Sequence, residues 1–188
     1  MRVFVALDFD ENLKRKLYDI GSLVKANASR GSWVKKENFH LTLKFLGEID
    51  ESQVESIGNL LEVVSSSYSA ISLKLDDLGF FNKRKGEYGV IWLGIEGDVD
   101  RLNKIYDIIE DDMEPLGFRK ERRPFKPHIT LGRRVVLDKP FIQIQQLADK
   151  NLDYDFLLDK LVLMRSEEIM GKRIYTPVKS YRLKNDHR

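Results

Sequence analysis

The order strand, helix, strand occurs twice in this 188-residue chain, and this repeat restricts the folds that the chain can adopt. Segments rich in β-branched and aromatic residues, or with alternating apolar residues, predict strands. These segments span residues 3–9, 39–46, 71–78, 90–95, 128–133, 154–164 and 173–183. A turn at Gly171 and Lys172 separates the last two of them.

Apolar residues at three- and four-residue spacing predict three longer helices between these strands. Asp10 is a candidate N-cap for the first helix, which is expected to end near Asn27, and Asp50 with Gln53 resembles a capping box for the second. The apolar positions are Leu13, Leu17, Ile20 and Val24; Val54, Ile57, Leu61 and Val64; and Leu102, Ile105, Ile109 and Met113. A fourth, short helix is expected at residues 141–147.

The repeat divides the chain into two similar halves, roughly residues 1–82 and 83–188. No low-complexity stretch or Pro/Gly-rich linker separates them, so we expect residues 1–188 to form a single bilobal domain. The predicted fold class is α+β, with two similar lobes that each contain an antiparallel β-sheet flanked by helices. The active-site cleft is expected between the lobes.

The composition excludes several kinds of functional site. The chain contains no cysteine, which removes disulfides, thiolate nucleophiles, zinc ribbons and iron–sulfur clusters. Lys and Arg number 32 against 30 for Asp and Glu, so any anion binding must come from local clustering. No apolar run reaches the roughly 18 residues of a membrane span, and the first apolar run is too short for a signal sequence. We therefore expect a cytoplasmic protein.

The histidines and threonines of the chain form an unusual pattern. Only three threonines occur, and Thr42 and Thr130 each lie two residues after a histidine, His40 and His128. The third, Thr176, precedes a proline and is assigned no role. Both His-x-Thr segments are strand-like and have an aliphatic residue after each polar one.

A spacing of two places the histidine and the threonine of each segment on one face of a strand. Imidazoles titrate near neutral pH, so one can accept a proton while the other donates one. Threonine hydroxyls can hydrogen-bond the phosphate oxygens on which negative charge develops. The pattern therefore indicates phosphodiester hydrolysis, with one imidazole and one hydroxyl from each lobe.

At these residues the chain resembles the 2H phosphoesterase superfamily, whose signature is two His-x-Thr-x motifs in two similar lobes. Within it, the chain resembles the RNA 2′,3′-cyclic phosphodiesterase branch, also called 2′-5′ RNA ligase. The segments that carry this resemblance are residues 2–7, 38–48, 77–81, 90–94, 125–133 and 175–177.

The resemblance implies hydrolysis of a 2′,3′-cyclic phosphate at an RNA 3′ end to a 2′-phosphomonoester, without a metal or a nucleotide cofactor. It implies that His128 is the proton acceptor that activates water and that His40 is the proton donor to the departing 3′ oxygen. Thr42 and Thr130 would bind the phosphate. The same site could run in reverse and form a 2′-5′ linkage. Implied partners are RNA 3′ ends, tRNA fragments among them, and the protein is expected to be a monomer.

Two alternatives stay open at this point. The chain could be a phosphodiesterase that acts on another cyclic or 2′-5′-linked nucleotide. It could also be a non-catalytic protein that binds phosphorylated RNA ends, although intact His and Thr residues in both motifs argue against this.

Arg133 is a further candidate for substrate binding, because a guanidinium binds phosphate with two parallel hydrogen bonds. Strict strand alternation places it on the face opposite His128 and Thr130, so it reaches the cleft only if the strand twists, bulges or ends there. Arg134 lies an even number of residues after His128 and Thr130, so strict alternation places it on the same face as these two residues. Other residues that RNA could contact are the basic segments 119–126 and 83–86 and the aromatic residues Trp33, Phe80 and Phe125. A solvated loop or core packing explains each of them equally well or better. His187 lies in a polar tail and is assigned no role.

Overall fold

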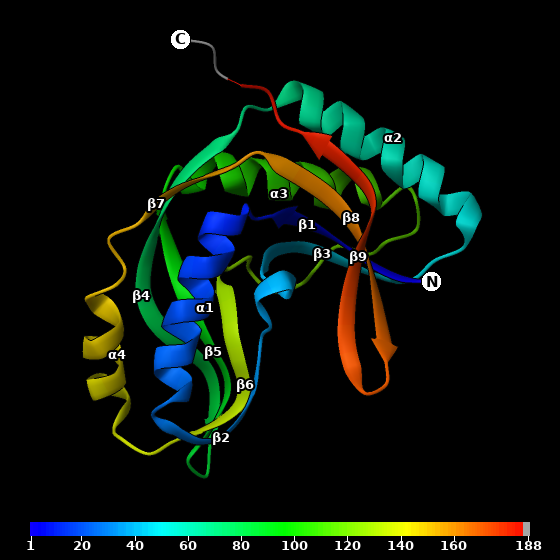
Figure 1. Ribbon diagram of the computed structural model, residues 1–188. Helices are drawn as coiled ribbons and strands as arrows, with labels where there is room; N and C mark the ends of the chain where they lie inside the picture. The colour runs from blue at the N-terminus through cyan, green and yellow to red at the C-terminus, as the bar shows by residue number, and fades with distance from the viewer. Residues whose placement is uncertain (186–188) are drawn as a thin grey trace.

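Two antiparallel sheets form the framework of the protein (Figure 1). The structure, a computed structural model, describes residues 1–185, and the strands named below lie within them. The first sheet has the order β3 (His40–Glu48), β1 (Arg2–Asp8), β8 (Lys160–Ile169), β9 (Lys172–Arg182). The second has the order β2 (Ala28–Trp33), β6 (Ile129–Leu137), β5 (Glu87–Gly97), β4 (Ile71–Arg84), β7 (Asp155–Leu158).

All four predicted helices are present, and α1, α2 and α4 begin where the sequence predicts them. They are α1 (Glu11–Lys25), α2 (Glu51–Ser67), α3 (Val99–Met113) and α4 (Phe141–Asp149), with a short 3-10 helix, η1 (Lys36–Asn38), before β3. The Asp10 carboxylate accepts the backbone N–H of Leu13 at 2.7 Å and caps α1. The Gln53 side chain accepts the backbone N–H of Asp50 at 3.1 Å, as expected for a capping box on α2.

The two sheets do not coincide with the two halves of the chain. β4 comes from the first half of the chain but lies in the second sheet, beside β5. β8 and β9 come from the second half but lie in the first sheet, with β1 and β3. The helices cross over as well, because α1 follows β1 but packs on β2, β6 and α4, whereas α3 follows β5 but packs on β3 and α2. The lobes therefore share their elements and cannot separate as independent domains.

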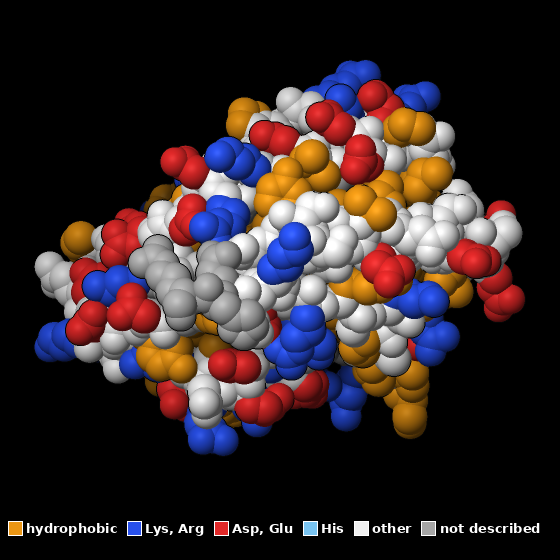
Figure 2. All heavy atoms as spheres, turned by 90° about the horizontal axis from the view of Figure 1, so that it is seen from above, with side chains coloured by type: hydrophobic (Ala, Val, Ile, Leu, Met, Phe, Trp, Pro, Cys, Tyr) orange, Lys and Arg blue, Asp and Glu red, His pale blue; other side chains and the backbone are white. Residues whose placement is uncertain are grey.

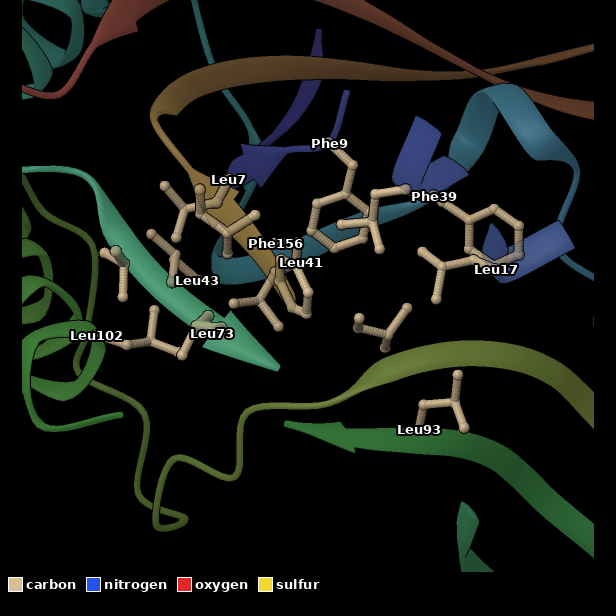
Figure 3. Packing of buried hydrophobic residues seen from close by; sticks show 14 of the residues in the cluster. Leu7, Phe9, Leu17, Phe39, Leu41, Leu43, Leu73, Leu93, Leu102 and Phe156 are labelled. Atoms are coloured by element: carbon tan, nitrogen blue, oxygen red, sulfur yellow. The ribbon is translucent and has the colours of Figure 1, made fainter. Parts of the chain in front are cut away.

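One continuous core joins the two sheets. Figure 3 shows it between the strands, with Leu7 and Leu41 contributed by the first sheet and Leu73 and Leu93 by the second. A smaller cluster on the other face of the first sheet contains Phe4, Ala6, Val162 and Met164, with Tyr175 packed against it. This second face is the one on which His40 lies.

One expectation about the strands was wrong, and one strand was not predicted. The strand expected at residues 154–164 is two strands, β7 and β8, which belong to different sheets. The chain passes between the sheets at Asp159, whose carbonyl accepts the backbone N–H of Leu183 at 2.8 Å. β2 was not predicted, because its sequence ASRGSW has no apolar alternation and it is held by pairing with β6.

Charges of both signs are interspersed over the face seen in Figure 2, in line with the nearly balanced composition. None of the helices within residues 1–185 combines the length and the hydropathy that crossing a membrane requires.

Candidate active site

The two motif histidines lie at the start of equivalent strands and are held in the same way. His40 is the first residue of β3, and His128 directly precedes β6. In each, Nδ1 lies 2.7 Å from the carbonyl oxygen of the residue two positions earlier, Asn38 or Lys126. A carbonyl oxygen only accepts hydrogen bonds, so Nδ1 carries the proton and Nε2 is left to exchange one.

The motif threonines lie on the same faces as the histidines. Thr42 Oγ1 is 2.9 Å from His40 Nε2, so the hydroxyl donates to the neutral ring and can accept from the protonated one. Thr42 and Thr130 are half-buried, whereas the aliphatic residues beside them are buried. Those residues are Leu41, Leu43, Ile129 and Leu131. The predicted alternation of a polar and an apolar face is confirmed in both motifs.

Two aromatic rings flank each imidazole. The ring centroids of Phe4 and Tyr175 lie 4.8 and 5.1 Å from that of His40. Phe81 meets His128 edge-on at 5.0 Å, and Trp92 lies 6.2 Å from it. These rings limit the access of water to the imidazoles and restrict their rotation.

A β-bulge in β6 determines where Arg133 lies. Trp92 of β5 pairs with Thr130, whereas its neighbour Ile91 pairs with Gly132, so β6 carries one extra residue between them. The extra residue reverses the alternation, and Arg133 points to the face of Thr130. Strict alternation therefore does not apply here, and Arg133 is exposed on the face of the motif.

The first motif contains the same irregularity. The pairing of β3 with β1 shifts by one residue directly after Thr42. Phe45, three residues after Thr42, occupies the position that the arginine holds on β6, and 71% of its surface is exposed. Its ring centroid lies 5.8 Å from that of Phe4, which also contacts His40. One motif strand thus presents a guanidinium beside its imidazole and hydroxyl, and the other presents an aromatic ring.

The positive charge of Arg133 lowers the pKa of both imidazoles, so both motifs lie within electrostatic range of this arginine. Burial lowers the pKa of His40 from 6.5 to about 4, and the positive charge of Arg133 contributes to the lowering. Burial also lowers the pKa of His128, and Arg133 and Lys126 add to this effect. Both rings are therefore neutral at pH 7 when no substrate is bound.

Asp8 distinguishes the surroundings of His40 from those of His128. Asp8 pairs with His40 across β1 and β3, and its negative charge favours the protonated form of that ring. The carboxylate lies 2.9 Å from the Lys14 ammonium and 3.1 Å from that of Lys160. Burial alone would raise the pKa of Asp8, but the two lysines outweigh it and lower that pKa.

Lys126 places a positive charge beside His128. In the sequence it was a candidate only as a member of the basic segment 119–126. Its ammonium lies 4.8 Å from the ring centroid of Trp92 and 5.3 Å from that of Phe81. Cation–π contacts of this kind hold a charged side chain in place. The same rings contact His128, so Lys126 is fixed close to the second motif.

The remaining aromatic candidates pack away from the histidines. Phe125 stacks on Tyr106, and Phe80 contacts Tyr88 and Phe141. Trp33 packs against the core, where its ring lies over Gly132. Core packing is therefore the better explanation for Trp33 and Phe125, whereas Phe80 packs against other rings but stays 39% exposed.

The basic segment at residues 83–86 forms the turn of the β4–β5 hairpin, as its sequence suggested. Arg134 has a positive φ of 52° and lines a hollow together with Arg30 and Glu87. Thr176 pairs with Arg165 in the β8–β9 hairpin, and His187 lies outside the described residues. Within residues 1–185 no group of three or more His, Asp or Glu side chains is arranged to hold a metal ion.

Comparison with known proteins identifies the family. The family model LigT like Phosphoesterase matches residues 7–92 and, a second time, residues 93–175. The chain belongs to the LigT-like phosphoesterase family. It is therefore an enzyme of the phosphodiesterase class.

Relatives and solved structures agree with this assignment. The chain is 38% identical over 133 residues to an RNA 2′,3′-cyclic phosphodiesterase of Thermotoga maritima, covering 71% of this chain and 70% of that protein. It is 35% identical over 156 residues to the Methanocaldococcus jannaschii protein of the same name, covering 83% and 84%.

The fold matches a Thermus thermophilus protein with a TM-score of 0.79 at 23% identity, over 100% of both chains. It matches E. coli LigT complexed with 3′-AMP with a TM-score of 0.78 at 24% identity, over 98% of both. The bilobal α+β architecture that the sequence predicted is confirmed.

Proposed function

We propose that this LigT-like phosphoesterase hydrolyses 2′,3′-cyclic phosphates at RNA 3′ ends to 2′-phosphomonoesters. The observation that carries the proposal is the pair of matched imidazoles, each with Nδ1 held by a carbonyl, and the one guanidinium, of Arg133, that acts on both. The names of the relatives from Thermotoga maritima and Methanocaldococcus jannaschii support the same substrate.

In the proposed reaction, His128 Nε2 accepts a proton from water as the water oxygen attacks phosphorus. The bond from phosphorus to the 3′ oxygen breaks, and His40 Nε2 donates its proton to that oxygen. Thr42, Thr130 and Arg133 stabilise the negative charge on the phosphate oxygens. A 2′-phosphate and a free 3′-hydroxyl result.

The charges around the two rings support this division of roles. The side-chain charges that act on His128 are the cations Lys126 and Arg133, which favour the neutral form that a base needs. His40 differs in having the negative charge of Asp8 beside it, which favours the protonated form that an acid needs, while the cations Lys14 and Arg133 act on it in the opposite direction. Burial keeps His40 neutral in the empty site, so we propose that it gains its proton together with the negatively charged phosphate.

The exposed ring of Phe45 suits an RNA end as the substrate. Single-stranded ends are commonly bound by stacking of a base on an aromatic face. Phe45 lies in the lobe of His40, the proposed donor to the ribose oxygen, so the nucleoside of the substrate belongs on this side. Ligation in the reverse direction, metal independence, a monomeric state and a cytoplasmic location stay predictions.

The test is incubation of a short RNA ending in a 2′,3′-cyclic phosphate with the protein in excess chelator, followed by identification of the product. We expect conversion to a 2′-phosphate by the wild type and by His187→Ala, which removes the histidine without an assigned role. His40→Ala and His128→Ala should each lose about 10²–10⁴-fold in rate.

A 3′-phosphate product, or activity that persists in the His128 variant, would contradict the proposal. Parallel assays with 3′,5′-cyclic nucleotides and with 2′-5′-linked dinucleotides test the alternative substrates. We expect slower turnover of both than of the RNA with a 2′,3′-cyclic phosphate. Binding of RNA ends without any turnover would favour the non-catalytic alternative.

A further inference from the structure

Lys44 and Glu110 form an ion pair inside the protein, between β3 and α3. Lys44 Nζ lies 2.8 Å from Glu110 Oε1, and the two side chains are only 4% and 7% exposed. Lys44 lies two residues after Thr42, and the bulge after Thr42 turns it inward beside the buried Leu43. A residue close to the first motif is thus tied to a helix that leads to the second.

Both members of the pair use their remaining hydrogen-bonding capacity on one segment. Lys44 Nζ also donates to the carbonyl oxygen of Arg119 at 2.9 Å. The second oxygen of Glu110 accepts the backbone N–H of Glu121 at 2.8 Å. We refer to residues 118–128, which lie between α3 and β6, as the connecting segment (Figure 1).

The connecting segment contains no helix or strand, so its conformation depends on such contacts. Glu121 organises the next residues, because its carboxylate accepts the backbone N–H groups of Arg122 and Arg123 at 2.9 and 3.2 Å. Farther along, the ring of Phe125 stacks on Tyr106 of α3, with centroids 4.0 Å apart. Glu110 and Tyr106 are one turn apart on α3 and hold the two ends of the connecting segment.

The connecting segment ends at the groups that orient the second imidazole. The carbonyl of Lys126 accepts the Nδ1 proton of His128, and this bond selects the tautomer in which Nε2 is free. A displacement of the connecting segment that reaches Lys126 would move that carbonyl. The contacts therefore run without interruption from β3, through the buried ion pair and the connecting segment, to His128.

We propose that Lys44 and Glu110 are positioning residues that set the orientation of His128 relative to the first motif. The catalytic part of this inference rests on the proposed function. An apolar pair of similar volume stabilises a core as well as a buried ion pair does. An apolar pair would, however, leave the Arg119 carbonyl and the Glu121 N–H without their partners, and the connecting segment would lose its anchor.

The test uses the double variant Lys44→Met/Glu110→Leu, which replaces the ion pair without leaving one charge unpaired. The control is Lys74→Met/Asp153→Leu, which makes the same kind of replacement in an exposed ion pair of 3.1 Å that forms no hydrogen bond or ion pair with Arg119 or Glu121. Urea unfolding reports folding, ¹⁵N NMR of the imidazoles reports their tautomers, and kcat and KM are measured with the cyclic-phosphate RNA.

We expect the folded double variant to lose the single His128 tautomer while the His40 signals stay as in the wild type. The kcat should fall at least tenfold with KM changed less than threefold, because about 1.4 kcal/mol of misorientation already costs a factor of ten. The control should match the wild type in every measurement. Unchanged His128 signals and kcat in a folded double variant would overturn the proposal.

A second variant tests the proposal if the double variant does not fold. Glu110→Gln keeps the size of the side chain but removes the charge that holds Lys44, and it should shift the His128 signals in the same direction by a smaller amount. Unchanged signals in this variant would also overturn the proposal. The NMR measurement needs no turnover, so it tests the positioning role even if the wild type does not hydrolyse the RNA.

Discussion

The lowered pKa of His40 predicts that the protein loses stability as the pH falls below neutral. The unfolded chain binds a proton at this histidine near pH 6.5, whereas the folded protein binds it only near pH 4. Above pH 7 the ring is neutral in both states and contributes no pH dependence. Below pH 6.5 protonation stabilises the unfolded state alone, so the free energy of unfolding decreases until the folded state also takes up the proton.

The magnitude follows from the two pKa values. Each pH unit between them corresponds to about 1.4 kcal/mol, so between pH 7.5 and pH 5 His40 should lower the free energy of unfolding by about 2 kcal/mol. His128, whose pKa is also lowered, adds to the effect in the same direction. The carboxylates titrate mostly below this range and contribute little to it.

The assay is urea unfolding at pH 7.5, 6.5, 5.5 and 5.0 for the wild type, His40→Gln and His187→Gln. Glutamine does not titrate, so His40→Gln should lose about 2 kcal/mol of the pH dependence, whereas His187→Gln should keep all of it. Equal pH dependence in the wild type and in His40→Gln would show that the ring is accessible to water, and the argument from burial would be refuted.

Three further predictions concern the candidate site and the packing beside it. Arg133→Gln should raise KM for the cyclic-phosphate RNA about tenfold by removing a charge-assisted contact, with partial recovery in Arg133→Lys; an unchanged KM would exclude the arginine from the site. Thr42→Val, which removes the hydroxyl 2.9 Å from His40 Nε2, should lower kcat on the order of 100-fold without loss of stability in urea. Gly79→Ala would place a Cβ 2.3 Å from the Trp92 ring, so unfolding should become easier by about 1–3 kcal/mol, whereas Gly21→Ala, with its nearest contact at 4.0 Å, should not destabilise.

The sequence predicted the parts of the fold that depend on local pattern. Helix α1 follows from its capping aspartate and its apolar spacing, and the two faces of each motif strand follow from the alternation of polar and aliphatic residues. The His-x-Thr pattern directed attention to the residues that lie around Arg133. Each of these inferences depends only on residues that are close together in the sequence.

Features that depend on pairing between distant strands could not be predicted. The direction of Arg133 is set by the register between β5 and β6, and no local pattern reveals a bulge there. The break at Asp159 reflects the passage of the chain from one sheet to the other. Tyr175, which contacts His40, is far from it in the sequence, and only the pairing of β1 with β8 and β8 with β9 brings it close.

The interleaved topology has a consequence for catalysis. Two lobes connected by a simple hinge could open and close, and their imidazoles would then lack a fixed separation. Here α1 and α3 each follow a strand of one sheet and pack on the other, and a continuous core fills the space between the sheets. Separating the lobes would expose that core, so the relative placement of the motifs is set on folding. Stabilisation of a charged transition state needs groups that are already in place when charge develops, and under the proposed function this arrangement would supply them.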